Sequence, residues 1–122
     1  MNSQDLMKIV KERNDSVITT LDSKQAEYAS NGDRFHNFRR GAEILGGTPE
    51  QALGGFMSKH IVSVLDLIKW TETEPDRITE ELINEKIGDN IVYLHLLEGL
   101  LRERLAKRKQ EEPKVFTPDN RV

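Results

Sequence analysis

The 122-residue sequence contains no cysteine, which excludes disulfides, thiolate metal sites and a cysteine nucleophile. No apolar run approaches the roughly 18 to 20 residues of a membrane span. The first residues, Met1–Asp5, lack the basic start and apolar stretch of a signal peptide. From these absences we expect an intracellular, cytoplasmic protein without membrane contact.

Motifs of common enzyme classes are also missing. The sequence has no phosphate-binding loop, no dinucleotide fingerprint, no Gly-x-Ser-x-Gly elbow and no zinc-ligand spacing. An excess of positive charge is lacking too, because 18 Lys and Arg stand against 21 Asp and Glu, for a formal charge of −3. We therefore do not expect broad binding to duplex nucleic acid.

The composition favours an elongated helical protein. Hydrophobic residues make up 36% of the chain and charged residues 32%, a balance that leaves a lean core and favours self-association. No segment alternates between apolar and polar residues as a strand would. We predict an all-α, four-helix bundle that forms one domain over residues 1–109, followed by an extended or disordered tail over residues 110–122.

Cap residues and apolar periodicity define the predicted helices. Ser3 and Thr79 are expected to cap the first and last helices, and Thr48-Pro49-Glu50-Gln51 has the pattern of a capping box with proline at the first helical position. A polar linker is expected over residues 71–76. The helices are expected over residues 3–28, 35–45, 49–70 and 80–109.

The last predicted helix is apolar on almost every side between Ile91 and Leu101. A helix that is apolar all round must be covered all round, and three other helices cannot do this alone. We therefore expect a homodimer or a larger homo-oligomer to supply the missing cover.

Two polar groupings interrupt the third and fourth predicted helices. On the third, His60 and Ser63 lie one turn apart and Asp66 follows one turn later. On the fourth, one side carries the polar side chains of Lys86, Asp89, Asn90 and Tyr93. Each grouping also has a purely structural explanation. In the first, His60 could be buried and hydrogen-bonded to a neighbouring helix; in the second, the charges could form salt bridges along the helix.

A third grouping spans residues 33–40, where arginines alternate with phenylalanines and an asparagine. Guanidinium groups can bind phosphates, ring faces can stack on a base, and an amide can read the base edge. The alternative is that the two phenylalanines belong to the core and the arginines face water. Trp70, at the end of its helix, could likewise stack a base or cover the core.

Two segments resemble the MazG-like all-α nucleoside triphosphate pyrophosphohydrolases. HIVSVLDLIKW (residues 60–70) is similar to the Glu-x-x-Glu segment of that family, and EKIGDNIVYL (residues 85–94) is similar to its Glu-x-x-Asp segment. The resemblance implies a helical bundle that binds nucleotides. The four magnesium-ligand positions of the family fall on His60, Ser63, Lys86 and Asp89, so one carboxylate of four remains.

These departures disfavour magnesium, which needs several oxygen ligands and carboxylate charge beside a polyphosphate. His60 and Lys86 could instead meet phosphate directly, which is typical of a nucleotide binder. A divergent pyrophosphohydrolase that uses Asp66, Glu85 and Asp89 for magnesium is the first alternative. A structural adaptor bundle is the second.

A longer set of segments is similar to the small phage proteins of the Thoeris anti-defence group. The matching segments are residues 13–17, 27–29, 36–38, 48–53 and 59–60. This resemblance implies an oligomeric sponge that sequesters cyclic ADP-ribose isomers without cleaving them, and so blocks bacterial anti-phage signalling.

We therefore predict a non-catalytic nucleotide binder without a metal or other cofactor. Its phosphate contacts are expected to be Arg39, Lys59, His60 and Lys86. The base is expected to stack on Phe38 or Trp70, with Asn37 or Asn90 at its edge.

Overall fold

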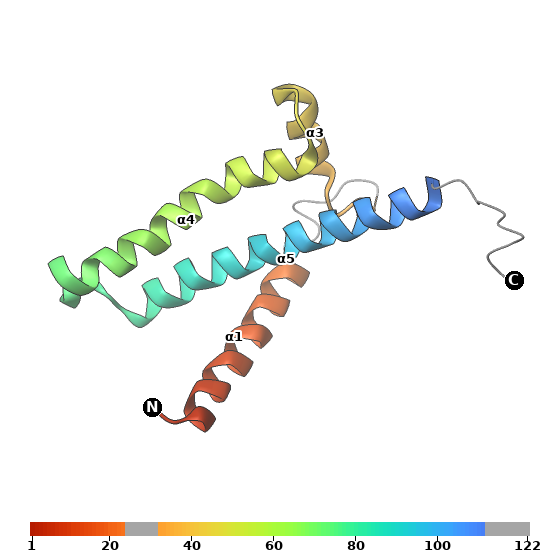
Figure 1. Cartoon of the computed structure of the whole chain (residues 1–122). Helices are drawn as coiled ribbons and strands as arrows, with labels where there is room; N and C mark the ends of the chain where they lie inside the picture. Colours follow the sequence, from red (N-terminus) through yellow and green to blue (C-terminus); the bar gives the residue numbers. More distant parts are fainter. Residues whose placement is uncertain (24–31, 112–122) are drawn as a thin grey trace, which may run out of the picture.

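The computed structural model describes residues 1–23 and 32–111. The elements of this described part are helices: α1 (Ser3–Ser23), α3 (His36–Leu45), α4 (Pro49–Thr73), the short 3-10 helix η1 (Pro75–Arg77) and α5 (Glu80–Glu111) (Figure 1). The predicted all-α class is confirmed.

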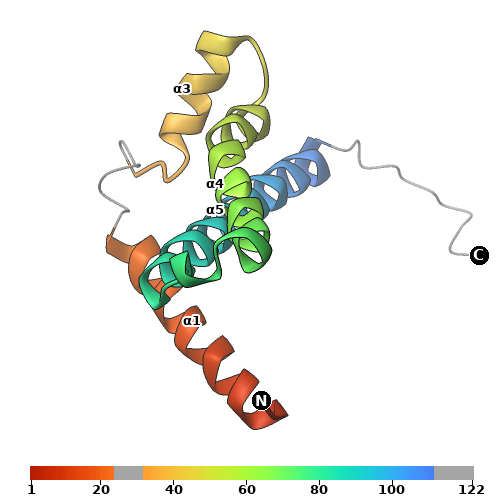
Figure 2. The same cartoon turned by 90° about the vertical axis from the view of Figure 1, so that its left-hand side faces the viewer.

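Helices α4 and α5 form an antiparallel hairpin that is joined through η1 (Figures 1 and 2). Helix α3 packs against α4 at the open end of the hairpin, and α1 crosses α5 on the other side. The result is an open arrangement in which the long α5 contacts both α1 and α4.

The core lies where α1, α3, α4 and α5 approach one another. Leu53 is fully buried, with an exposed fraction of 0%. Burial of such side chains supplies most of the free energy of folding. The buried cluster consists of Val17 from α1, Phe38 from α3, Leu53 and Met57 from α4, and Val92, Leu96 and Leu100 from α5.

One close approach in this core requires a glycine. The Phe35 ring lies so near Gly99 that a Cβ atom there would be 2.8 Å from the ring. Because such a contact is far inside van der Waals distance, only glycine lets the start of α3 pack this closely on α5.

The predicted caps are confirmed at two helices and wrong at one. The Thr48 hydroxyl accepts from Gln51 N at 3.1 Å and the Gln51 side chain accepts from Thr48 N at 2.9 Å, which completes the capping box. Thr79 Oγ1 accepts from Leu82 N at 3.2 Å at the start of α5. At α1 the cap is Asn2 rather than Ser3, because Asn2 Oδ1 accepts from Asp5 N at 2.8 Å.

Helix ends differ from the predicted ones by a few residues. Helix α4 continues to Thr73 and η1 follows at once, so most of the predicted polar linker is helical. Helix α5 continues to Glu111, two residues into the predicted tail. Residues 24–28 of the first predicted helix and residues 112–122 of the tail lie outside the described residues.

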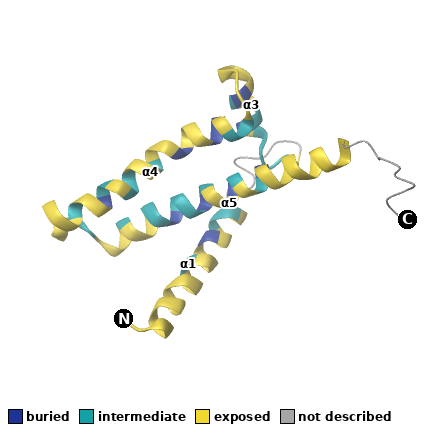
Figure 3. Ribbon diagram, viewed as in Figure 1, coloured by how far each residue is buried: buried dark blue, intermediate teal, exposed yellow. Residues whose placement is uncertain are grey.

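Residues 1–23 and 32–111 leave much of their apolar surface exposed. Leu6 and Met7 on α1 are 51% and 62% exposed, and α4 and α5 carry further exposed aliphatic side chains such as Leu65 and Leu94. The ribbon in Figure 3 is coloured as exposed along most of α1 and the end of α5. Within the described residues, no helix has the length and apolarity needed to cross a bilayer.

We expect Thr48→Ala to lower the free energy of unfolding by about 1 kcal/mol, because the substitution removes the acceptor for an amide hydrogen at the start of α4. Urea denaturation at one fixed protein concentration measures the change. Ser58→Ala is the matched control, since Ser58 is an exposed hydroxyl inside the same helix, and it should lose no stability. Equal losses in both variants would contradict the role of the cap.

Candidate functional site

A cavity of about 210 Å³ lies where α1, α3, α4 and α5 meet. The side chains around it are two aromatic rings, a histidine, a lysine, an aspartate, a threonine and two aliphatic groups. They belong to Thr20, Phe38, Lys59, His60, Asp89, Val92, Tyr93 and Leu96. The cavity therefore combines ring surfaces with groups that can bind an anion.

His60 is the best-fixed polar group of this cavity. Its Nδ1 atom lies 3.5 Å from Asp89 Oδ2, and its ring packs on the Tyr93 ring with centroids 4.8 Å apart. The His60 side chain is 20% exposed and that of Asp89 is 40% exposed. With Nδ1 turned toward the carboxylate, Nε2 is the ring atom left for another partner.

Asn90 holds the two long helices together beside His60. Its Nδ2 atom donates to the backbone carbonyls of His60 and Lys86, both at 2.8 Å. Because both amide hydrogens have acceptors, the Asn90 Nδ2 group is already satisfied within the chain.

Trp70 and Lys86 lie toward the closed end of the hairpin and do not line this cavity. The Trp70 ring carries the Arg77 guanidinium 4.1 Å from its centroid and the Lys86 ammonium 5.7 Å away. These cation–π contacts connect η1 with both long helices. Lys86 Nζ is thus directed to Trp70 rather than to His60.

Arg39 is paired with two carboxylates. Its guanidinium lies 2.7 Å from Asp33 and 2.8 Å from Glu103. The hydrogen bond from Arg39 lowers the pKa of Asp33, and the hydrogen bond to Asp33 raises the pKa of Arg39.

Asn37, the predicted contact for a base edge, lies two residues before Arg39 in the first turn of α3 and is exposed.

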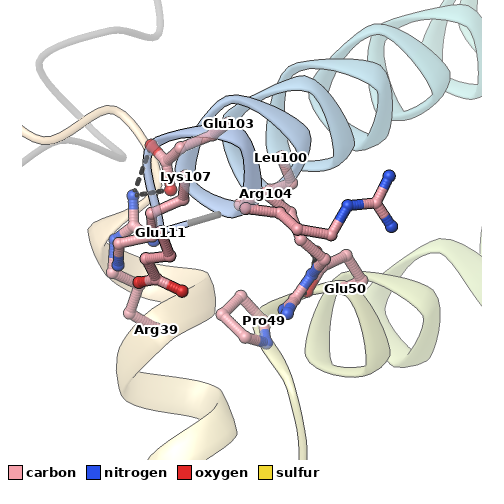
Figure 4. A pocket seen from close by; sticks show the side chains of 9 residues that line it. Arg39, Pro49, Glu50, Leu100, Glu103, Arg104, Lys107 and Glu111 are labelled. Carbon is pink, nitrogen blue, oxygen red and sulfur yellow. Dashed lines mark hydrogen bonds and ion pairs between the residues drawn. The ribbon is translucent and has the colours of Figure 1, made fainter. Parts of the chain in front are cut away.

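A second, larger hollow of about 500 Å³ lies between the start of α4 and the end of α5 (Figure 4). Arg104 and Glu50 face each other there through two hydrogen bonds of 2.6 and 2.7 Å. The bond from Arg104 lowers the pKa of Glu50. This bidentate ion pair fastens the open end of the α4–α5 hairpin.

The residues at the four inferred magnesium positions do not fit the ion. Only Asp89 offers a carboxylate, and it faces His60. Among residues 1–23 and 32–111, no three His, Asp or Glu side chains are grouped so that they could hold a metal ion. The alternative set of Asp66, Glu85 and Asp89 therefore forms no such group.

The structure brings together some of the predicted ligand contacts and separates others. Phe38, Lys59 and His60 line one cavity, and Asn90 lies beside it. Arg39 lines the second hollow, and Trp70 with Lys86 forms a third location. Sequence reasoning missed Thr20 of α1, although Thr20 lies three residues after the buried Val17 and so on nearly the same face of α1.

No protein-family profile, curated protein or solved structure matches the chain.

The Glu50–Arg104 ion pair makes stability depend on pH. Since the folded pKa of Glu50 is lowered, its charge stabilises the fold above the unfolded pKa of about 4.3, and this contribution is lost as the pH falls through the folded pKa. We expect Glu50→Gln to lower Tm by roughly 2 to 4 °C at pH 7 and hardly at all at pH 3.

Thermal melts at both pH values measure this difference. Glu12→Gln, on the exposed surface of α1, is the control and should change Tm little at either pH. A loss in Glu50→Gln that is equally large at pH 3 and pH 7 would show that the ion pair is not its cause.

Proposed function

We propose that this protein is a non-catalytic sponge that binds and sequesters a nucleotide-type messenger. The observation that carries the proposal is the cavity in which Lys59 and His60 meet the rings of Phe38 and Tyr93. Cationic and aromatic side chains in one cavity match the two chemical parts of a nucleotide, its phosphate and its base.

Each part of such a ligand has a partner in this cavity. Lys59 is an exposed cationic side chain of α4 that lines the cavity. His60 supplies Nε2, while its Nδ1 atom faces Asp89. Phe38 is buried, with an exposed fraction of 4%, so the half-buried Tyr93 ring is the better stacking surface for a base.

The size of the cavity favours a shared site. Pockets for whole small molecules usually enclose roughly 300 to 1,000 Å³, and this cavity encloses about 210 Å³. One chain therefore holds only part of a nucleotide. Because the cavity lies on the side of α5 that carries Val92 and Leu96, a copy of the chain that binds on this side together with the ligand would complete the cover and add a second set of basic side chains.

The resemblance to the Thoeris anti-defence group narrows the ligand to a cyclic ADP-ribose isomer and the biological role to blocking bacterial immune signalling. The resemblance to MazG-like enzymes supports nucleotide binding by the same helices. Binding without hydrolysis is favoured because the ligand positions for magnesium carry His60, Ser63 and Lys86, a set that cannot hold the ion beside a polyphosphate.

A binding and recovery experiment tests the proposal. We expect the purified chain to bind a cyclic ADP-ribose isomer without added metal and, after heat denaturation, to return it with unchanged mass. Mass spectrometry of the released fraction is the measurement. Release of pyrophosphate from nucleoside triphosphates, lost in Asp89→Ala, would instead establish the hydrolase alternative. Absence of binding to every nucleotide offered would favour the adaptor alternative.

Two lysine variants locate the phosphate contact. We expect Lys59→Ala to weaken binding by roughly 10- to 100-fold, because it removes a charge-assisted hydrogen bond. Lys69→Ala, an exposed lysine on the same helix, is the control and should bind as the unaltered chain does. Isothermal titration measures all affinities, and melts without ligand check the fold.

Lys86→Ala tests the prediction that Lys86 also contacts a phosphate. A loss of affinity on the order of 10-fold, with an unchanged melting temperature, supports direct contact. Unchanged affinity with a lower melting temperature would assign Lys86 to the Trp70 cluster alone.

A further inference from the structure

An apolar stripe that the described residues leave exposed follows α5 from Ile83 to Leu105. Ile83, Leu94, Leu101 and Leu105 are between 39% and 52% exposed, and Ile87 is half-buried at the same edge. The stripe lies on the face of α5 that is roughly opposite the buried Val92 and Leu96. The exposed fractions of the stripe residues show that α1 and α4 leave these side chains largely uncovered, although Asn90 at the edge of the stripe bonds to α4.

The apolar positions of the stripe are symmetric about Leu94. Ile87 and Leu101 lie seven residues to either side, and Ile83 and Leu105 lie eleven residues to either side. A spacing of seven keeps side chains on one face when two helices pair and supercoil. A twofold axis at Leu94 would therefore place every apolar side chain of one copy opposite an apolar side chain of the other.

The charges at the two ends of α5 favour antiparallel over parallel pairing of two copies. The start of α5 over residues 80–89 carries four carboxylates and one lysine, whereas its end over residues 102–111 carries five basic and two acidic side chains. Parallel pairing would place like charges together at both ends. Antiparallel pairing places the acidic start of each copy beside the basic end of the other, and sets Glu80 opposite Arg108.

We infer that two copies of this chain pair through α5 in antiparallel orientation, with Leu94 at the twofold axis. The stripe from Ile83 to Leu105 spans about 33 Å, long enough for a continuous helix–helix interface. The partner is a second copy because the pattern is complementary to itself in both apolar spacing and charge. This inference does not depend on the proposed ligand, so failure of nucleotide binding leaves it standing.

The first test is the mass of the full chain in solution. Light scattering after size-exclusion chromatography should give twice the monomer mass of 14.0 kDa. Leu94→Glu places two carboxylates at the axis and should give the monomer mass with unchanged helix content. Leu65→Glu is the matched control, since Leu65 is 57% exposed on α4, and it should remain a dimer.

The second test fixes the direction of pairing and uses the absence of cysteine. A mixture of Glu80→Cys and Arg108→Cys chains, treated with a short bis-maleimide, should give a crosslinked pair that contains one chain of each kind. Either variant alone should give little crosslinked dimer. Intact-mass spectrometry distinguishes the products.

Three results would overturn the inference. The first is a monomer mass for the unaltered chain. Leu65→Glu could dissociate the dimer while Leu94→Glu does not. Glu80→Cys could crosslink efficiently to itself, which would show parallel pairing.

Discussion

The packing of α4 against α5 is the interaction on which the remaining structure depends. At the open end the two helices are joined by the Glu50–Arg104 pair, and at the middle Asn90 bonds to the carbonyl of His60. Helix α3 packs on α4, and α1 packs on α5. Without the hairpin, neither flanking helix would have a surface to cover, and the cavity around His60 would have no walls.

The same packing explains why His60 and Asp89 meet. The two residues are far apart in the sequence but lie at the same level of an antiparallel hairpin, so their side chains face each other. A contact of this kind requires only the correct pairing of two helices. The sequence shows a polar position on each helix, His60 on one and Asp89 on the other, but it does not show that the two positions face each other.

Local signals predicted local features well. Thr48 and Gln51 form their capping box because both partners lie within one turn. Gly46 ends α3 with a φ of 76°, the left-handed conformation that glycine adopts without strain. By contrast, Ser3 and Asn2 are equally suitable caps by residue type, and only the hydrogen bond to Asp5 N separates them.

Partners distant in sequence could not be predicted in this way. The sequence alone predicts that Arg39 is available to bind a phosphate. In the structure Arg39 is paired with Glu103, which lies 64 residues away in the sequence. Lys86 and Trp70 meet because η1 turns the chain back on itself. Local spacing gives no information about these pairings, since they depend on which faces of α3, α4 and α5 come together.

The way α1 packs makes its first turns less stable against local opening than the rest of the fold. Val17 is the one buried residue of α1. The first turns of α1 extend away from the core (Figures 1 and 3), and Leu6 and Val10 are 51% and 40% exposed. Cooperative units in proteins open according to the contacts they would lose. In an isolated chain the start of α1 therefore belongs to a separate unit of low opening free energy, whose amide hydrogens exchange with solvent long before those of α4 and α5.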